Sequence, residues 1–141
     1  MTLADGCPGA GAVKGAPLLL LRLEGAAALA LSVLAYREMG GGWGWFLGLF
    51  LLPDLSMLGY MLGARAGAAC YNLAHTYLAP ALVGIAAWVA GAEMAVLGSL
   101  IWSAHVGFDR LLGYGLKYPD AFGSTHLGTI GRAARRAGPE L

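Results

Sequence analysis

The chain has 141 residues, of which 58% are hydrophobic and 12% charged, and its mean hydropathy is +0.66. This composition excludes an ordinary soluble domain and is typical of an integral membrane protein. The formal net charge of +1, without a long basic run, excludes nucleic acid as a partner and leaves membrane lipids as the expected one.

Residues 1–16 form a Gly/Ala/Pro-rich stretch that lacks the basic start of a cleaved signal. We expect this stretch to be a disordered extension. Its cysteine, Cys7, and Cys70 within an apolar segment make neither a zinc-finger spacing nor a disulfide framework. Redox chemistry is therefore not indicated.

Four apolar segments follow, each of about the 20 residues that a helix needs to cross a bilayer. They lie near 17–36, 42–62, 66–90 and 92–115. The breaks between them are short, which makes sequential helices antiparallel neighbours. The sequence therefore predicts an all-α fold in which residues 17–115 form a four-helix transmembrane bundle.

An even number of spans places both termini on one side of the membrane, and basic residues mark the cytoplasmic side. That side would hold Lys14, Arg65, Lys117, Arg132, Arg135 and Arg136. Both termini are therefore expected in the cytoplasm, and the protein in the bacterial inner membrane. Residues 116–132, rich in turn formers, are predicted to be a cytoplasmic flap, and residues 133–141 a disordered tail.

The predicted spans contain ionisable side chains, each of which costs ~2.5 to 3.5 kcal/mol near mid-bilayer. At ~1.5 Å per residue, five of them fall about 9 to 15 Å from the cytoplasmic end of their helices. These five are Glu24, Asp54, His75, His105 and Asp109. Residues from four antiparallel helices thus share one predicted polar layer.

Arg22 and Arg110 face away from their acidic neighbours at ~100° per residue, so we expect both arginines to snorkel to the headgroups. The layer then keeps three carboxylates and two imidazoles without an internal cation. A divalent metal would neutralise most of this charge. The mixed N/O donor set suits zinc, manganese or iron rather than calcium, which avoids imidazole.

Two sets of motifs carry a resemblance. The segments 21–25, 52–60, 71–77, 104–118 and 125–128 resemble a family of small bacterial membrane proteins catalogued as domain of unknown function 4260. More distantly, Pro53-Asp54, His75-Thr76 and His105-x-x-x-Asp109 are similar to membrane-bound metal-dependent hydrolases. The chain has Asn72-Leu73-Ala74 where those hydrolases have His-Arg-Gly, which favours one metal or none over two.

Together these observations predict a metal-dependent hydrolase of an amphiphilic, lipid-like substrate. His75, His105 and Asp109 would be metal ligands, and Asp54 a ligand or general base. Glu24 would be a base or orient a ligand, and Asn72 and His126 would lie near the substrate.

Three other interpretations use the same residues. The polar layer can be purely structural, in a non-enzymatic membrane subunit or assembly factor. His75 and His105 can be axial ligands of a haem. The layer can also be part of a proton relay or ion path, which would need a homo-oligomer or a larger membrane complex.

Overall fold

The computed structural model describes residues 12–120 and 122–130, and it confirms an all-α fold. The helices are α1 (Gly15–Glu38), α2 (Trp43–Leu49), the 3-10 helix η1 (Leu52–Leu62), α3 (Ala64–Ala74), α4 (Leu78–Val89) and α5 (Glu93–Leu112). Two short strands, β1 (Ser124–Thr125) and β2 (Gly128–Thr129), form an antiparallel hairpin near the end of the described chain.

The second and third predicted helices are not continuous, so a count of four is not confirmed. The segment predicted at 42–62 divides into α2 and η1, and Pro53, which has no backbone N–H to donate, stands in the first turn of η1. The segment predicted at 66–90 divides into α3 and α4, which meet at an angle of 43°. Both breaks lie next to predicted site residues, Asp54 and His75.

Two helical stretches are long and apolar enough to cross a membrane: α1 and the combined stretch Trp43–Leu62. The bent pair of α3 and α4 becomes a third if it forms one broken span. Large apolar side chains are exposed along these stretches, among them Leu47 at 75%, Met61 at 84% and Val89 at 82%. Such surfaces suit lipid rather than water and indicate a membrane protein.

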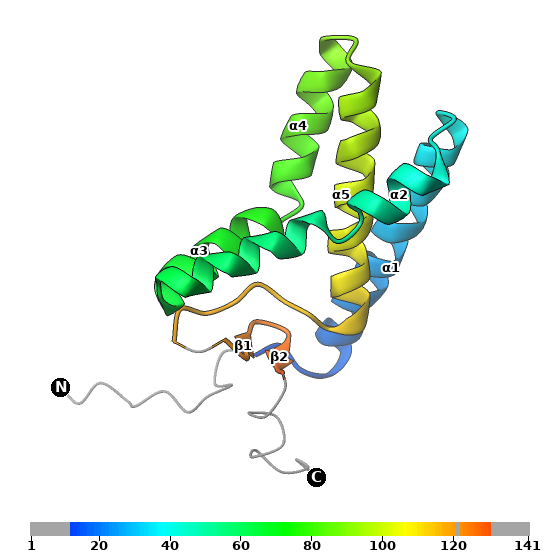
Figure 1. Cartoon of the computed structure of the whole chain (residues 1–141). Coiled ribbons are helices and arrows are strands. Elements are labelled where there is room, and N and C mark those ends of the chain that lie inside the picture. Colours follow the sequence, from blue (N-terminus) through cyan, green and yellow to red (C-terminus); the bar gives the residue numbers. More distant parts are fainter. Residues whose placement is uncertain (1–11, 121, 131–141) are drawn as a thin grey trace, which may run out of the picture.

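Helix α5 is the central element and packs against both α1 and α4 (Figure 1). It packs tightly against α1 at two glycines, Gly25 and Gly107. A Cβ added at Gly107 would lie 2.7 Å from the Gly25 carbonyl oxygen and from the Leu29 backbone nitrogen. The two backbones therefore touch at a point where neither helix has room for a side chain.

Helices η1 and α3 form an arm beside the packed helices α1, α4 and α5. In Figure 1, η1 and α3 lie side by side and project from α5, with the tail and the β1–β2 hairpin beneath them. The Val13 N–H donates to the His126 carbonyl, so the two ends of the described chain meet. This fits the prediction that both ends share one side. The predicted disorder of residues 133–141, and of most of 1–16, lies outside the described residues.

Candidate metal centre

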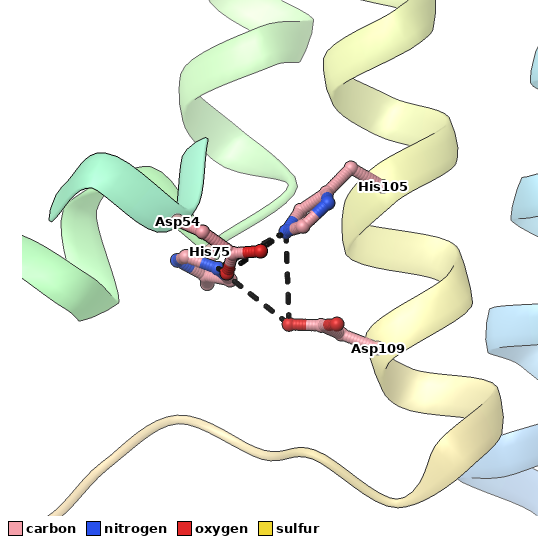
Figure 2. A group of neighbouring side chains, drawn as sticks. All are labelled: Asp54, His75, His105 and Asp109. Atoms are coloured by element: carbon pink, nitrogen blue, oxygen red, sulfur yellow. Dashed lines mark hydrogen bonds and ion pairs between the residues drawn. The ribbon is translucent and has the colours of Figure 1, made fainter. Parts of the chain in front are cut away.

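Four of the five residues of the predicted polar layer converge on one point (Figure 2). Asp54 comes from the first turn of η1, and His75 caps the C-terminal end of α3. His105 and Asp109 lie four residues apart on α5 and face the same direction. One ligand atom from each residue lies within 4.8 Å of all the others, an arrangement that can hold a metal ion.

The distances within this group match a single tetrahedral ion. Ligands at ~2.0 to 2.2 Å from zinc lie about 3.3 to 3.6 Å from one another. His75 Nε2 is 3.3 Å from Asp54 Oδ1 and 3.5 Å from Asp109 Oδ2. His105 Nε2 is 3.6 Å and 3.8 Å from the same two oxygens and 3.2 Å from His75 Nε2.

The other ring nitrogen of His75 settles which of its atoms can bind a metal. His75 Nδ1 lies 2.9 Å from the Tyr71 carbonyl oxygen, one turn earlier in α3. Because a carbonyl oxygen only accepts, Nδ1 must carry the proton. In the neutral ring Nε2 is then bare, with its lone pair directed at the group, which is how a metal-binding histidine is normally oriented.

Two imidazole nitrogens, His75 Nε2 and His105 Nε2, point into the group. When both rings are neutral, only His105 Nε2 can carry a proton. Its Nδ1 is buried and has no hydrogen-bond partner among the residues that the structure describes, and the Phe50 ring packs edge-on against the imidazole. Three acceptor atoms, from His75, Asp54 and Asp109, therefore face each other around at most one imidazole proton. Tyr71 adds one hydroxyl donor, 3.2 Å from Asp109 Oδ2. A bound cation would remove the remaining mutual repulsion.

Side chains of α5 form hydrogen bonds with the chain at the break after α3. The Trp102 indole N–H donates to the Ala74 carbonyl, and the Arg110 guanidinium donates to the carbonyls of His75 and Tyr114. These bonds satisfy carbonyls that a helix end leaves unpaired. The prediction that Arg110 snorkels to the headgroups is therefore wrong: Arg110 is 8% exposed, because it caps α3. Arg22 is exposed, as predicted, and donates to the Leu111 carbonyl.

Helix α5 ends at Leu112, less than one turn after Asp109, and directs the tail back under the arm. Gly113 takes a positive φ of 92°, and the Tyr114 N–H donates to the Asp109 carbonyl. Such a left-handed cap favours glycine and ends the helix sharply. The chain then passes Asn72, whose side-chain amide donates to the Lys117 carbonyl at 2.9 Å and accepts from the Lys117 N–H at 2.7 Å.

A cavity of about 730 Å³ opens beside the group. Its polar wall includes Asp54, His105 and Asp109, while η1 and the two residues before it, α3, α5 and the tail supply mostly apolar and aromatic side chains. Those side chains are Phe50, Leu51, Met57, Tyr71, Phe108, Leu112, Tyr114, Phe122 and Ile130. The size and lining are typical of a site for a small amphiphilic molecule.

Lys117 also lines this cavity, although the sequence indicated only a topology determinant. Its side chain is 5% exposed, and its Nζ lies 3.3 Å from the centre of the Phe122 ring, with Tyr71 and Tyr60 farther away. Burial lowers the Lys117 pKa, and the charges of Asp109 and Asp54 oppose that change. No motif signalled this position, because the tail approaches α3 only in the folded chain.

The other predicted site residues lie apart from the group. Glu24 is exposed on α1 and is not one of the converging ligands. Asn72 uses its amide to hold the tail, and His126 accepts the Leu116 N–H at Nδ1 within the tail. The haem alternative does not fit, because axial ligands with bonds of ~2.0 Å lie about 4 Å apart across a macrocycle. The two Nε2 atoms are 3.2 Å apart.

Comparison with known proteins gives one result. The model of the family described as Domain of unknown function (DUF4260) matches residues 18–130, which include every residue of the group and of the cavity wall. No curated protein and no solved structure matches the chain. The comparisons thus give no support to the likeness to metal-dependent hydrolases.

Proposed function

The chain belongs to the family described as Domain of unknown function (DUF4260), and from its site we propose that it is a membrane-bound, metal-dependent hydrolase. The proposed site holds one divalent ion on His75, His105, Asp54 and Asp109. The proposed substrate is an amphiphile whose apolar part occupies the adjoining cavity. Zinc, manganese and iron all suit two imidazoles and two carboxylates.

One observation carries this proposal: the mutual spacing of the four ligand atoms. Five of the six distances are between 3.2 and 3.8 Å, close to the ~3.3 to 3.6 Å of a tetrahedral zinc shell. Helix pairing alone requires each imidazole to meet one carboxylate. It gives no reason for both imidazoles to meet both carboxylates.

The protein groups have separate roles in hydrolysis. Four protein ligands would fill a tetrahedral shell, so Asp54 would have to leave the ion during hydrolysis and open the fourth position to a water, whose pKa near 7 would make it a nucleophile at neutral pH. Asp109 is held by Tyr71 and is 14% exposed, whereas Asp54 is 33% exposed and is the more open ligand. Asp54 is thus the carboxylate that can take the water's proton as the water attacks. That water adds across an ester or phosphoester bond, and the alcohol leaves with a proton.

Glu24 has no role in this proposal, because its carboxylate is exposed on α1 and outside the group. Asn72 acts indirectly, through the position of Lys117. His126 is not one of the described residues that line the cavity. Its effect on substrate is therefore also indirect, through the fold of the tail.

Metal analysis of the protein purified in an uncharged detergent tests the proposal. We expect about one zinc, manganese or iron per chain in the wild type and a loss of that metal in His105→Ala. His126→Asn is the matched control, because it removes a histidine outside the group and should keep the metal. Hydrolysis is then assayed on 4-nitrophenyl dodecanoate and dodecyl phosphate, before and after chelation.

The outcomes separate the proposal from its main alternative. A wild type that takes up no stoichiometric metal, even after incubation with each ion, contradicts the proposal. If His105→Ala then also lowers the melting temperature strongly, the group is structural and pairs α5 with the arm. If the metal-loaded protein hydrolyses neither the ester nor the phosphate, the metal site stands but the proposed hydrolase activity is wrong.

A further inference from the structure

The buried ammonium of Lys117 has no carboxylate partner in the described chain. The ammonium contacts aromatic faces instead, at 3.3 Å from the Phe122 ring centroid, 4.5 Å from that of Tyr71 and 5.3 Å from that of Tyr60. Cation–π contacts offset only part of the cost of removing an ammonium from water. Asp54 and Asp109 border the same cavity, but neither forms an ion pair with this ammonium in the described chain, so the ammonium is available to a negatively charged group of a ligand in the cavity.

The position of this ammonium is built into the fold. Asn72 bonds both the carbonyl and the N–H of Lys117, and Lys117 also forms an antiparallel bridge to Thr125. The next residue continues the pairing, because the Tyr118 N–H donates to the Ser124 carbonyl. A flexible surface lysine would need none of this. Here two separate segments hold the backbone of a lysine that lines the same cavity as Asp54, His105 and Asp109.

The charge around the cavity changes sign when a metal binds. Without metal, Asp54 and Asp109 contribute two negative charges and Lys117 one positive charge, which leaves a net charge of about −1. A divalent ion on the group changes the total to about +1. The cavity then attracts an anion, and the ammonium and the ion would approach it from two sides.

We propose that Lys117 is the anion-recognition group of the cavity, so that the ligand is an amphiphile with a negatively charged headgroup. This inference rests on the proposed metal site and names its substrate class. The headgroup, a phosphate monoester or a carboxylate, lies between the ammonium and the ion. Its chain lies along Phe50, Met57 and Leu112. Zwitterionic and uncharged amphiphiles of equal chain length leave the ammonium without a partner and bind less tightly.

Native mass spectrometry in an uncharged detergent can test this, because it resolves bound metal and bound amphiphile in one spectrum. The probes share a twelve-carbon chain: dodecyl phosphate, dodecanoate, dodecylphosphocholine and dodecanol. The first two distinguish phosphate from carboxylate recognition. The variants are Lys117→Met, which keeps an apolar side chain of similar length, and Lys117→Arg, which keeps the charge. Arg65→Met is the control, because it removes an exposed cation on α3.

We expect the metal-loaded wild type to bind an anionic probe about tenfold or more tightly than dodecanol or dodecylphosphocholine. Removal of the metal should abolish that preference. Lys117→Met should lose the preference yet keep its metal, while Lys117→Arg and Arg65→Met should retain both. Metal content and melting temperature show that each variant is folded.

Two results overturn the inference while the metal site stands: a loaded wild type without anionic preference, or a loaded Lys117→Met that keeps it. A wild type that binds no metal contradicts the proposed function. This inference falls with it, because without a metal ion the cavity keeps its net negative charge and gives anions no preference.

Discussion

His75 Nε2 and His105 Nε2 lie 3.2 Å apart, although one belongs to the broken end of α3 and the other to the middle of α5. Because His75 Nδ1 already donates to the Tyr71 carbonyl, the neutral His75 ring can only accept at this contact. Either His105 donates its single proton to His75, or a cation binds both rings. In the first case the two carboxylates beside them still lack a positive partner, and in the second case the cation is that partner.

Replacing the carboxylate of Asp54 by an amide should therefore affect metal affinity differently from the same replacement at Glu24. Asp54→Asn removes a charged ligand and should weaken metal binding by about tenfold or more, an effect at least as large as that of altering a ligand's supporting partner. Glu24→Gln removes the same charge from an exposed position on α1 and should leave the affinity unchanged. Competition with a chromogenic chelator measures both. Equal losses would mean that the group responds only to overall charge.

Asn72→Ala should release the tail from α3. The substitution removes both hydrogen bonds to the Lys117 backbone, at a cost of about 1 to 3 kcal/mol in the free energy of unfolding. Hydrogen exchange at the Lys117 amide should become faster, while exchange within α5 stays slow. Ser56→Ala is the control, because the buried Ser56 hydroxyl has no partner among the described residues. Unchanged protection at Lys117 would show that the Thr125 bridge holds the tail alone.

Gly107→Ala should separate α1 from α5. The new Cβ would meet backbone atoms of Gly25 and Leu29 at 2.7 Å, and a backbone cannot rotate away as a side chain can. We expect a loss of about 1 to 3 kcal/mol, typical of overpacking. Gly98→Ala, on the same helix with nothing within 4 Å, should be neutral or stabilising by up to ~1 kcal/mol. Thermal melting in detergent compares them, and similar melting temperatures would contradict the observed contact.

The fold of the tail should weaken in mild acid through His126. Burial, and then the charge of Arg110, lower the His126 pKa below its ordinary value of 6.5, and the Leu116 N–H donates to Nδ1 at 2.8 Å, which requires the neutral ring. The unfolded chain therefore binds the proton first. Stability from His126 is complete above about pH 6.5 and is lost as the pH falls through the lowered pKa.

His126→Asn isolates this contribution, because an amide oxygen can accept the same N–H but does not titrate. The melting temperature of the wild type should fall more than that of His126→Asn between pH 7.5 and pH 5. The difference between the two proteins removes the contributions of the titratable groups that both share. Parallel curves for the two proteins would assign the acid sensitivity to other groups.

Much of this architecture could be predicted from local pattern. Apolar segments of sufficient length predict helices that suit a membrane, and glycines at the predicted breaks end them, as Gly40 and Gly91 do with positive φ. Counting residues from the helix ends also placed Asp54, His75, His105 and Asp109 at one depth. Depth depends only on rise per residue, and the four side chains do meet.

Rotation and interruption of the helices could not be predicted in the same way. Glu24 has the right depth but lies on an exposed face of α1, and that face is decided by how α1 packs at Gly25 and Gly107. The break after α3 has no proline or glycine at His75, Thr76 or Tyr77. Its unpaired carbonyls are satisfied by Trp102 and Arg110, about 28 to 35 residues later in the chain.

By itself, the sequence determined that this chain forms apolar helices and that two histidines and two aspartates share a depth, because hydropathy and helical rise are local properties. The tertiary structure alone decided that α3 ends at His75, that Arg110 is buried as its cap, and that the tail brings Lys117 to the cavity. Each of these depends on hydrogen bonds between segments distant in sequence. Such bonds can form and stabilise the fold only once α5, the arm and the tail have packed together.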